Sequence, residues 1–285
     1  MPELPEVQAL AESLDESLRG AAIQDVVIRS VAALKTYAPP VDALRGLGIT
    51  GVHRVGKFID IEAAPLHLVV HLARAGWLRL RAQPTNARPS LRGPLIMVLT
   101  LGDHRALEAT EQGTEKRLAI YLVRDLQQVA GIARLGVDAL ADDLTVPGLG
   151  ELLRTQTGTL KNVLADQAVI AGIGNAYSDE ILHAARLSPF RKAAGLDPDE
   201  VARLHVEMRA VLTDAVTRAR NANPTELRGD KKVRMRVHGR TGERCPVCGD
   251  VIREVSYTSR SFQYCATCQT GGKVHADRRL SRLLR

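Results

Sequence analysis

The 285-residue chain lacks any apolar run long enough to span a bilayer. Its amino terminus is acidic and lacks the basic-then-apolar order of a signal peptide. Internal repeats and long low-complexity stretches are also missing. These absences predict a cytoplasmic protein that does not enter a membrane. Hydrophobic residues still make up 45% of the chain, enough to bury the cores of two or three folded units.

Acidic residues are scarce in only one part of the chain, its last quarter. Residues 217–285 contain 16 Lys and Arg against 6 Asp and Glu, a net charge of +10, whereas the remainder contains 23 against 26. A basic segment joined to a nearly neutral body indicates a polyanionic partner, most simply nucleic acid. A solvated basic tail is the alternative unless this segment contains a structured element.

Cysteine is absent outside one window of 24 residues. The motifs "CPVCGD" and "YCATCQ" supply all four cysteines, which are Cys245, Cys248, Cys265 and Cys268. Two C-x2-C pairs sixteen residues apart have the spacing of a zinc ribbon. Disulfides are the alternative, but a cytoplasmic location disfavours them. We therefore predict one structural Zn²⁺ held by four thiolates, a closed shell that does not activate water.

The residues between the two cysteine pairs, "GDVIREVSYTSRSFQY", have the pattern of a short hairpin. Two strands are expected, joined by a turn at residues 258–260. Arg260 would then lie at the tip of the ribbon. The basic segment therefore contains a structured element, which supports a nucleic-acid partner.

The first residues, "MPELPEV", raise a question of their own. Pro5 suits the first turn of a helix and Glu6 its positive end, so the stretch taken alone favours a helix start. That leaves Pro2 unexplained. A small second residue normally permits removal of Met1, and the new terminus would be a secondary amine with an ordinary α-amino pKa of about 8. An amine beside a carboxylic acid is what attack on a sugar carbon requires.

The pattern of the rest predicts an α+β multidomain protein. Short apolar runs between residues 23 and 123, separated by turn signals, favour an antiparallel β-sandwich behind the N-terminal helix. The stretch "AGIGNAYSDEIL" interrupts a helical pattern with two glycines and then resumes it, which fits a helix–two-turn–helix whose amides and Asn175 face a phosphate. The predicted boundaries are 1–134 for the sandwich, 135–147 for a linker, 148–236 for the helical domain, 237–269 for the zinc ribbon and 270–285 for a basic C-terminal extension.

Six motifs occur in an order that resembles the formamidopyrimidine-DNA glycosylase / endonuclease VIII family of DNA repair enzymes. They are "PELPEV", "GKFID", "HLARAGWL", "KNVLADQAVIAGIGNAYSDEIL", "VHGRTGERCPVCG" and "YCATCQ", and they span nearly the whole chain. The resemblance implies a β-sandwich domain and a helical domain ending in the ribbon, with damaged DNA, duplex or single-stranded, in the cleft between them. It also implies excision of oxidised bases followed by strand cleavage, in a nucleoid-associated protein that we expect to be a monomer.

The resemblance also implies roles for individual residues. Pro2, freed of Met1, would attack C1′ of the damaged nucleotide, and the resulting iminium ion would promote strand cleavage by β,δ-elimination. Glu3 would protonate the sugar ring oxygen, which requires an acid that is held close and partly desolvated, and Glu6 would fix the terminus. The residues expected to contact phosphates are Lys57, Lys161, Asn175 and Arg260, of which Arg260 would also assist the second elimination. His53 and His71 are expected to be structural.

Two loops depart from the 8-oxoguanine-removing branch of the family. An enzyme that flips a nucleotide must fill the gap that it leaves. Arg74 stands where that branch has methionine, and Lys116, Arg117 and Leu118 stand where it has Arg-Arg-Phe. We expect these residues to contact DNA, with Leu118 as a smaller wedge. A second departure is Ser259, beside Arg260, where the family usually has glycine.

Three functions are therefore compatible with the sequence. The first is a bifunctional glycosylase and abasic-site lyase. The second is a lyase or damage-binding protein that has lost base excision, which the altered gap-filling residues suggest. The third is a zinc-ribbon DNA-binding regulator, for which a free proline terminus would have no use.

Overall fold

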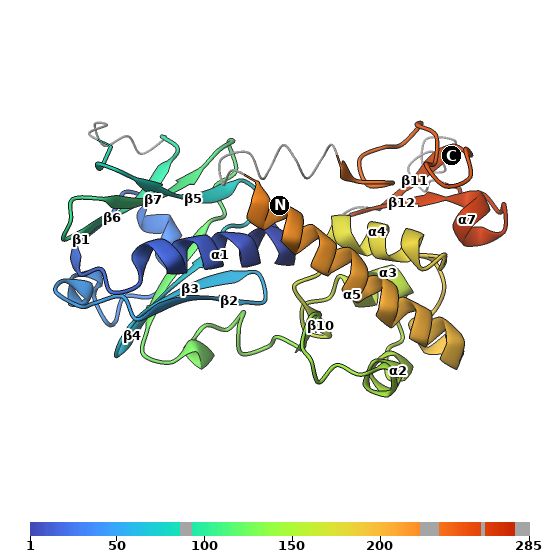
Figure 1. Ribbon diagram of the computed structural model, residues 1–285, viewed down its shortest axis with the longest axis horizontal. Helices are drawn as coiled ribbons and strands as arrows, with labels where there is room; N and C mark the ends of the chain where they lie inside the picture. The colour runs from blue at the N-terminus through green and yellow to red at the C-terminus, as the bar shows by residue number, and fades with distance from the viewer. Residues whose placement is uncertain (86–92, 223–233, 258–259, 277–285) are drawn as a thin grey trace. The chain divides into compact units, whose positions relative to one another are not determined.

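The computed structural model describes residues 1–85, 93–222, 234–257 and 260–276 (Figure 1). The chain divides into two compact units. The first contains Met1–Arg134 and Val216–Thr225, and the second contains Leu135–Ala215 and Glu226–Arg285. The second unit therefore begins where the predicted linker was expected to begin.

Helix α1 (Leu4–Leu18) opens the first unit. Pro5 lies in its first turn. Glu3 and Glu6 form a capping box, in which the carboxylate of each residue accepts the backbone N–H of the other. The Glu3 N–H donates to Glu6 Oε2 at 2.8 Å. The helix buries its apolar stripe, which includes Val7, Leu10 and other residues at helical spacing. The first motif therefore does start a helix, as the sequence predicts.

Two four-stranded antiparallel sheets make up the rest of the first unit, which confirms the predicted sandwich. One sheet has the order β1-β6-β7-β5 and the other β2-β3-β4-β8. The strands are β1 (Ile23–Ile28), β2 (Gly51–Val55), β3 (Phe58–Ala63), β4 (Leu66–His71), β5 (Gly76–Arg81), β6 (Leu95–Leu101), β7 (Ala106–Glu111) and β8 (Ala119–Val123). Their buried faces are rich in Val, Ile and Leu, as expected where β-branched and aliphatic side chains pack on a pleated surface.

The second unit combines helices with the ribbon hairpin (Figure 1). Its helices within the described residues are α2 (Val146–Arg154), α3 (Leu160–Leu164), α4 (Asn175–Ala184), α5 (Pro198–Asn221) and α7 (Ala266–Thr270). Strands β11 (Ile252–Ser256) and β12 (Ser261–Cys265) pair antiparallel with Ile252 opposite Cys265, which confirms the predicted hairpin. The predicted linker is not structureless, because β9 (Val137–Asp138) pairs in parallel with β10 (Ile170–Ala171).

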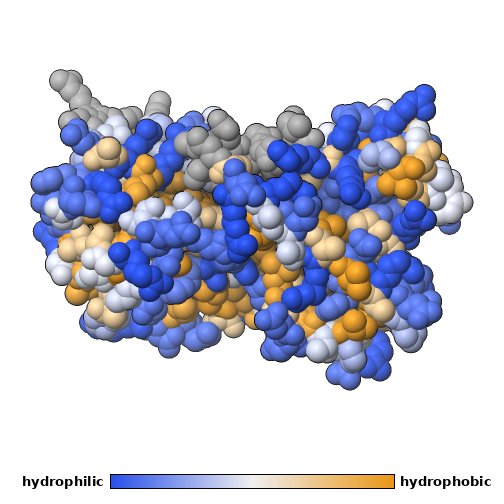
Figure 2. All heavy atoms as spheres, in the orientation of Figure 1, coloured by the Kyte–Doolittle hydropathy of each residue, from blue (hydrophilic) through white to orange (hydrophobic). Residues whose placement is uncertain are grey.

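Helix α5 is assigned to both units, since its residues from Val216 onward pack within the first. There Arg220 forms an ion pair with Glu12 of α1, with Nη2 and Oε1 2.6 Å apart. Within the described parts of the chain, no helix is long and apolar enough to cross a membrane. The face of the molecule in Figure 2 is largely covered by hydrophilic side chains, with apolar ones in scattered patches.

A close backbone approach marks the start of β5. The N–H of Gly76 donates to the Leu72 carbonyl at 2.8 Å, and a Cβ at Gly76 would lie 2.3 Å from that carbonyl oxygen and 2.8 Å from Leu118 Cδ1. Only glycine fits this approach without movement of the backbone.

We expect Gly76→Ala to lower the free energy of unfolding by about 1–3 kcal/mol, because the added methyl overpacks against backbone that cannot move aside. Chemical denaturation measures this change. Gly48→Ala is the matched control, since its Cβ would meet no atom within 4 Å. Equal stabilities of the two variants would contradict the expected clash.

Candidate active site and DNA-binding residues

The amino-terminal residues are held from within the first unit. Pro2 is buried, Glu3 is 2% exposed and Glu6 is 3% exposed, whereas Met1 is half exposed. Because Glu6 accepts the N–H of Glu3, its carboxylate restrains the residue that directly follows Pro2. The carboxylate of Glu3 in turn accepts the N–H of Glu6. Two carboxylates are therefore fixed at the start of one helix, directly after Pro2 in the chain.

Lys57 lies in the turn between β2 and β3, next to Gly56 with a φ of 59°. Its side chain is buried rather than freely exposed. Burial, followed by the charge of Lys57, lowers the pKa of His71 to about 4, so this imidazole is neutral at physiological pH. The ring of Phe58 packs against His71 at 4.7 Å between centroids. The ammonium of Lys57 therefore acts on a nearby histidine that is neutral.

His53 is more exposed than His71. Its Nε2 lies 3.5 Å from the carboxylate of Glu62, and more than half of its side chain is accessible to solvent.

The loop before β8 is anchored by the buried carboxylate of Glu111. It accepts the backbone N–H of Arg117 at 2.8 Å and that of Leu118 at 3.0 Å. Leu118 is only 2% exposed and packs toward Gly76. The prediction that Leu118 is a wedge is therefore wrong for this structure, because the side chain is part of the core of the sandwich.

The exposed side chains at this edge are cationic. Arg74 is exposed and follows Ala73, which has a φ of 51°. Lys116 and Arg117 are also exposed, and Arg117 Nη2 lies 3.1 Å from a carboxylate oxygen of Glu115. The backbone connects these two loops, since the N–H of Gln112 donates to the Ala75 carbonyl at 3.2 Å. The solvent-exposed side chains named in these two loops are therefore charged rather than apolar.

In the second unit, α4 begins at Asn175, four residues before Asp179, where the sequence pattern predicts that the helix resumes. Its side-chain Oδ1 is buried and accepts no hydrogen bond from the part of the chain that the structure describes. Backbone N–H groups at a helix start are available to an anion. The contact between Asn175 and a phosphate stays a prediction.

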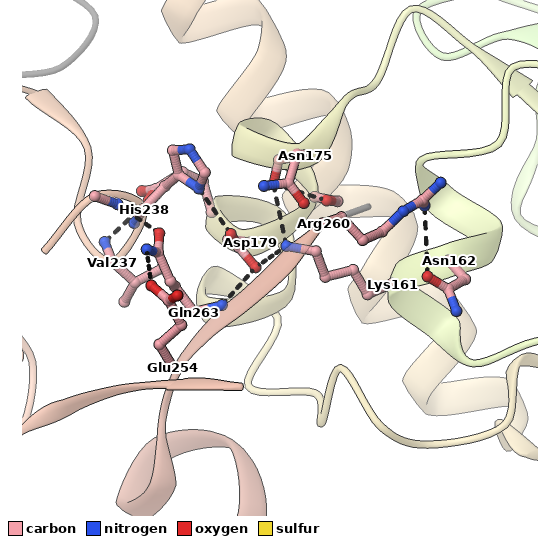
Figure 3. A network of polar contacts seen from close by, with 12 residues as sticks. Lys161, Asn162, Asn175, Asp179, Val237, His238, Glu254, Arg260 and Gln263 are labelled. Carbon is pink, nitrogen blue, oxygen red and sulfur yellow. Dashed lines mark hydrogen bonds and ion pairs between the residues drawn. The ribbon is translucent and has the colours of Figure 1, made fainter. Parts of the chain in front are cut away.

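Lys161 is not at the surface, which corrects the expectation that it contacts phosphate directly. Its side chain is fully buried and forms an ion pair with Asp179 (Figure 3). The ammonium also donates to the Asn175 carbonyl at 3.2 Å and lies 5.1 Å from the ring centroid of Phe262. The physical reason is the neighbouring carboxylate, which neutralises the lysine inside the protein.

Arg260 directly precedes β12 and is partly exposed. Its Nη1 lies 3.4 Å from Oδ1 of Asn162, the neighbour of Lys161 on α3 (Figure 3). The ribbon arginine and the helix–two-turn–helix are thus in contact within one unit. The turn shape expected to differ because of Ser259 lies outside the described residues.

Sequence reasoning missed the acidic residues that hold these segments in place. Asp179, Glu180 and Glu111 are at most 6% exposed. Asp179 and Glu180 accept hydrogen bonds from segments distant in the sequence, and Glu111 accepts them from the loop that follows its own strand. Burial raises the pKa of Glu180. The backbone N–H groups that it accepts lower the pKa, but the effect of burial is larger. For Asp179 and Glu180 the available signal was the pair "DE" directly before the apolar pair "IL", since carboxylates are rarely buried unless paired.

The four cysteines converge at the base of the hairpin. Their Sγ atoms all lie within 4.8 Å of one another, with 3.3 Å between Cys248 and Cys265 and 3.9 Å between Cys245 and Cys268. Burial raises the pKa of the Cys265 thiol to about 11. Holding several buried thiolates together requires a cation, and four sulfur ligands at these positions fit a tetrahedral metal such as zinc.

Together these features define a class of protein: a β-sandwich with a buried Pro-Glu terminus, joined to a helix–two-turn–helix and a four-cysteine ribbon. Models of the formamidopyrimidine-DNA glycosylase N-terminal domain and of its H2TH domain match residues 1–115 and 135–225. The formamidopyrimidine-DNA glycosylase of Thermus thermophilus is 34% identical over 281 residues, covering 95% of this chain and all of the relative. The chain therefore belongs to the formamidopyrimidine-DNA glycosylase family.

Two further similarities agree with this assignment. An uncharacterized formamidopyrimidine-DNA glycosylase-like protein of Mycobacterium tuberculosis is 56% identical over 151 residues, covering 53% of this chain and 94% of that protein. The crystal structure of MutM (Fpg) from Thermus thermophilus superposes with a TM-score of 0.81 at 30% identity, covering 96% of this chain and all of that one. The Lactococcus lactis enzyme bound to DNA with an abasic site has the same fold, at 24% identity and a TM-score of 0.81, over 94% of this chain and 99% of that one.

We expect Cys265→Ser to release the metal and to lower the Tm of the second unit, because one of four thiolate ligands is lost. Metal analysis by atomic emission and thermal denaturation measure these effects. Arg260→Ala is the control, and we expect it to retain zinc while flattening the salt dependence of DNA binding by roughly one counterion. Carefully purified wild-type protein without zinc would contradict the assignment.

Proposed function

We propose that this protein is a DNA glycosylase and abasic-site lyase of base-excision repair. The observation that carries the proposal is the arrangement of Pro2, Glu3 and Glu6 at the start of α1, in a chain of the formamidopyrimidine-DNA glycosylase family. The capping box by itself explains the start of the helix, but it does not explain a proline at the second position. A regulator without chemistry is therefore the least favoured of the three functions.

The reaction begins after removal of Met1, when the Pro2 nitrogen is a secondary amine. Its lone pair attacks C1′ of the damaged nucleotide, and the bond between C1′ and the base breaks with its electrons leaving on the base, which takes up a proton. Protonation of the ring oxygen by Glu3 opens the sugar and leaves an iminium ion between Pro2 and C1′. Loss of a C2′ proton then expels the 3′ phosphate, a second elimination expels the 5′ phosphate, and water releases the enzyme.

Damaged DNA is the proposed partner, held by contacts to its phosphates. Asn175 at the start of α4 and Arg260 beside β12 supply such contacts from the second unit. Lys57 of the first unit is buried, and its contact with a phosphate stays a prediction. One Zn²⁺ on the four cysteines stabilises the hairpin next to Arg260, and the protein acts as a monomer in the cytoplasm at the nucleoid. Phosphate contacts of this kind fix position but do not read sequence.

A lyase that has lost base excision is favoured by one observation. Leu118 is buried and the neighbouring exposed side chains are Arg74, Lys116 and Arg117, so no apolar wedge is presented at this edge of the described structure. Flipping a stacked, paired base costs energy that a wedge offsets. An abasic site has no base to flip, so its cleavage does not need the wedge.

We expect Pro2→Gly to lower the borohydride-trapped yield on abasic DNA by at least about tenfold, because a primary amine of different reactivity replaces the secondary one. DNA affinity should change little. Pro40→Gly, an exposed proline outside the site, is the control and should trap normally. A protein with a verified blocked amino terminus that still forms the adduct at the full rate would show that Pro2 is not the nucleophile.

We expect abasic sites and oxidised pyrimidines in single strands or bubbles to be cleaved faster than 8-oxoguanine paired with cytosine. Stacking of an aromatic side chain on a base contributes about 1–3 kcal/mol, and these loops lack one. Single-turnover rates on matched oligonucleotides decide the order. Arg74→Met should move the preference toward duplex lesions, and a wild-type preference for the 8-oxoguanine–cytosine duplex would overturn this assignment of substrates.

A further inference from the structure

The second unit contains an ion pair that is fully withdrawn from solvent. Lys161 of α3 and Asp179 of α4 both have side chains that are 0% exposed, and the ammonium and carboxylate are in direct contact. Placing two charges in a protein interior is costly unless further hydrogen bonds satisfy them. The remaining partners of the two groups therefore indicate what the pair holds together.

Asp179 holds three segments of the chain. Besides Lys161, it accepts the backbone N–H of Gln263 in β12 at 3.2 Å and lies 2.8 Å from Nδ1 of His238. Figure 3 shows this carboxylate at the centre of the network, with Lys161, His238 and Gln263 converging on it. One buried carboxylate thus connects α3, the segment before the ribbon and the second ribbon strand.

The two proposed phosphate ligands of this unit are both attached to the pair. The Asn175 carbonyl accepts a hydrogen bond from Lys161 at 3.2 Å. Asn175 lies one helical turn before Asp179 on α4. Arg260 is three residues before Gln263, whose N–H is bound by Asp179. Its guanidinium contacts Asn162, which follows Lys161 on α3.

Neither charge of the pair faces solvent, so neither can contact DNA in this conformation. We propose that Lys161 and Asp179 are positioning residues, which fix Asn175 and Arg260 relative to each other so that both engage phosphates of one DNA strand. The inference rests on the proposed function, because it concerns the DNA contacts of that site. It assigns an indirect role to a lysine that the sequence places among the phosphate ligands.

Other contacts keep this part of the unit folded when the pair is changed. Glu180 independently holds the segment before the ribbon, accepting the backbone N–H groups of Arg236, Val237 and His238 at 2.8–2.9 Å. The four cysteines close the base of the hairpin. Removing only one charge would leave the other buried and unpaired, so both must be neutralised together.

The test is the double variant Lys161→Met/Asp179→Asn. Its control is Arg154→Met/Glu151→Gln, which removes the same two charges from an exposed pair on α2, 3.8 Å apart. Both proteins are compared with wild type for zinc content, Tm, affinity for a duplex containing a tetrahydrofuran abasic-site analogue, the salt dependence of that affinity, and the rate of borohydride trapping on abasic DNA.

We expect the double variant to keep its zinc and to lose affinity by about tenfold, with a salt slope smaller by roughly one to two counterions, because Asn175 and Arg260 no longer engage together. The control should match wild type. A folded, zinc-loaded double variant with wild-type affinity and salt slope overturns the inference. Wild-type protein that forms no trapped adduct would instead overturn the proposed function, and the affinity measurements would still decide the inference.

A second variant keeps the inference testable if the double variant does not fold. Asn162 is exposed, so Asn162→Ala should leave the Tm unchanged. We expect it to lower affinity and the salt slope in the same direction as Arg260→Ala, and to add nothing in a protein that already carries Arg260→Ala. Wild-type binding by Asn162→Ala, or full additivity with Arg260→Ala, overturns the proposed positioning of Arg260.

Discussion

A buried carboxylate that accepts backbone N–H groups recurs at three segments of the chain near residues with a proposed function. Glu6 accepts the N–H of Glu3 beside the proposed nucleophile, and Glu111 accepts two N–H groups in the loop before β8. Glu180 accepts three in the segment before the ribbon. An ionised carboxylate accepts hydrogen bonds in several directions, and charge-assisted bonds are stronger than neutral ones. Irregular backbone is thereby fixed without regular secondary structure.

This device suits a protein whose proposed ligand is a polyanion. Carboxylates at the surface would repel DNA, whereas buried ones are compensated by N–H groups or by a lysine and stabilise the fold. The exposed side chains near the proposed sites are then free to be cationic or neutral, as at Arg74, Arg117 and Arg260.

The loop before β8 shows how a family member changes its surface without changing its fold. The sandwich superposes on that of its relatives, but Leu118 fills space against Gly76 inside the core. The carboxylate of Glu111 fixes the backbone at this point. The side chains that remain exposed to solvent there include those of Lys116 and Arg117. A change in substrate preference is therefore compatible with an unchanged framework.

The sequence by itself determined the elements whose causes are local. Proline and glutamate at the start of a helix, two C-x2-C pairs at ribbon spacing, and paired glycines before Asn175 each restrict the backbone within a few residues. Only the tertiary structure decided which side chains lie inside. Lys161 and Leu118 appear in the sequence as a cation and a small wedge, but a carboxylate 18 residues away neutralises the first and a glycine in another strand accommodates the second. Burial depends on partners brought together by folding, and no local pattern specifies them.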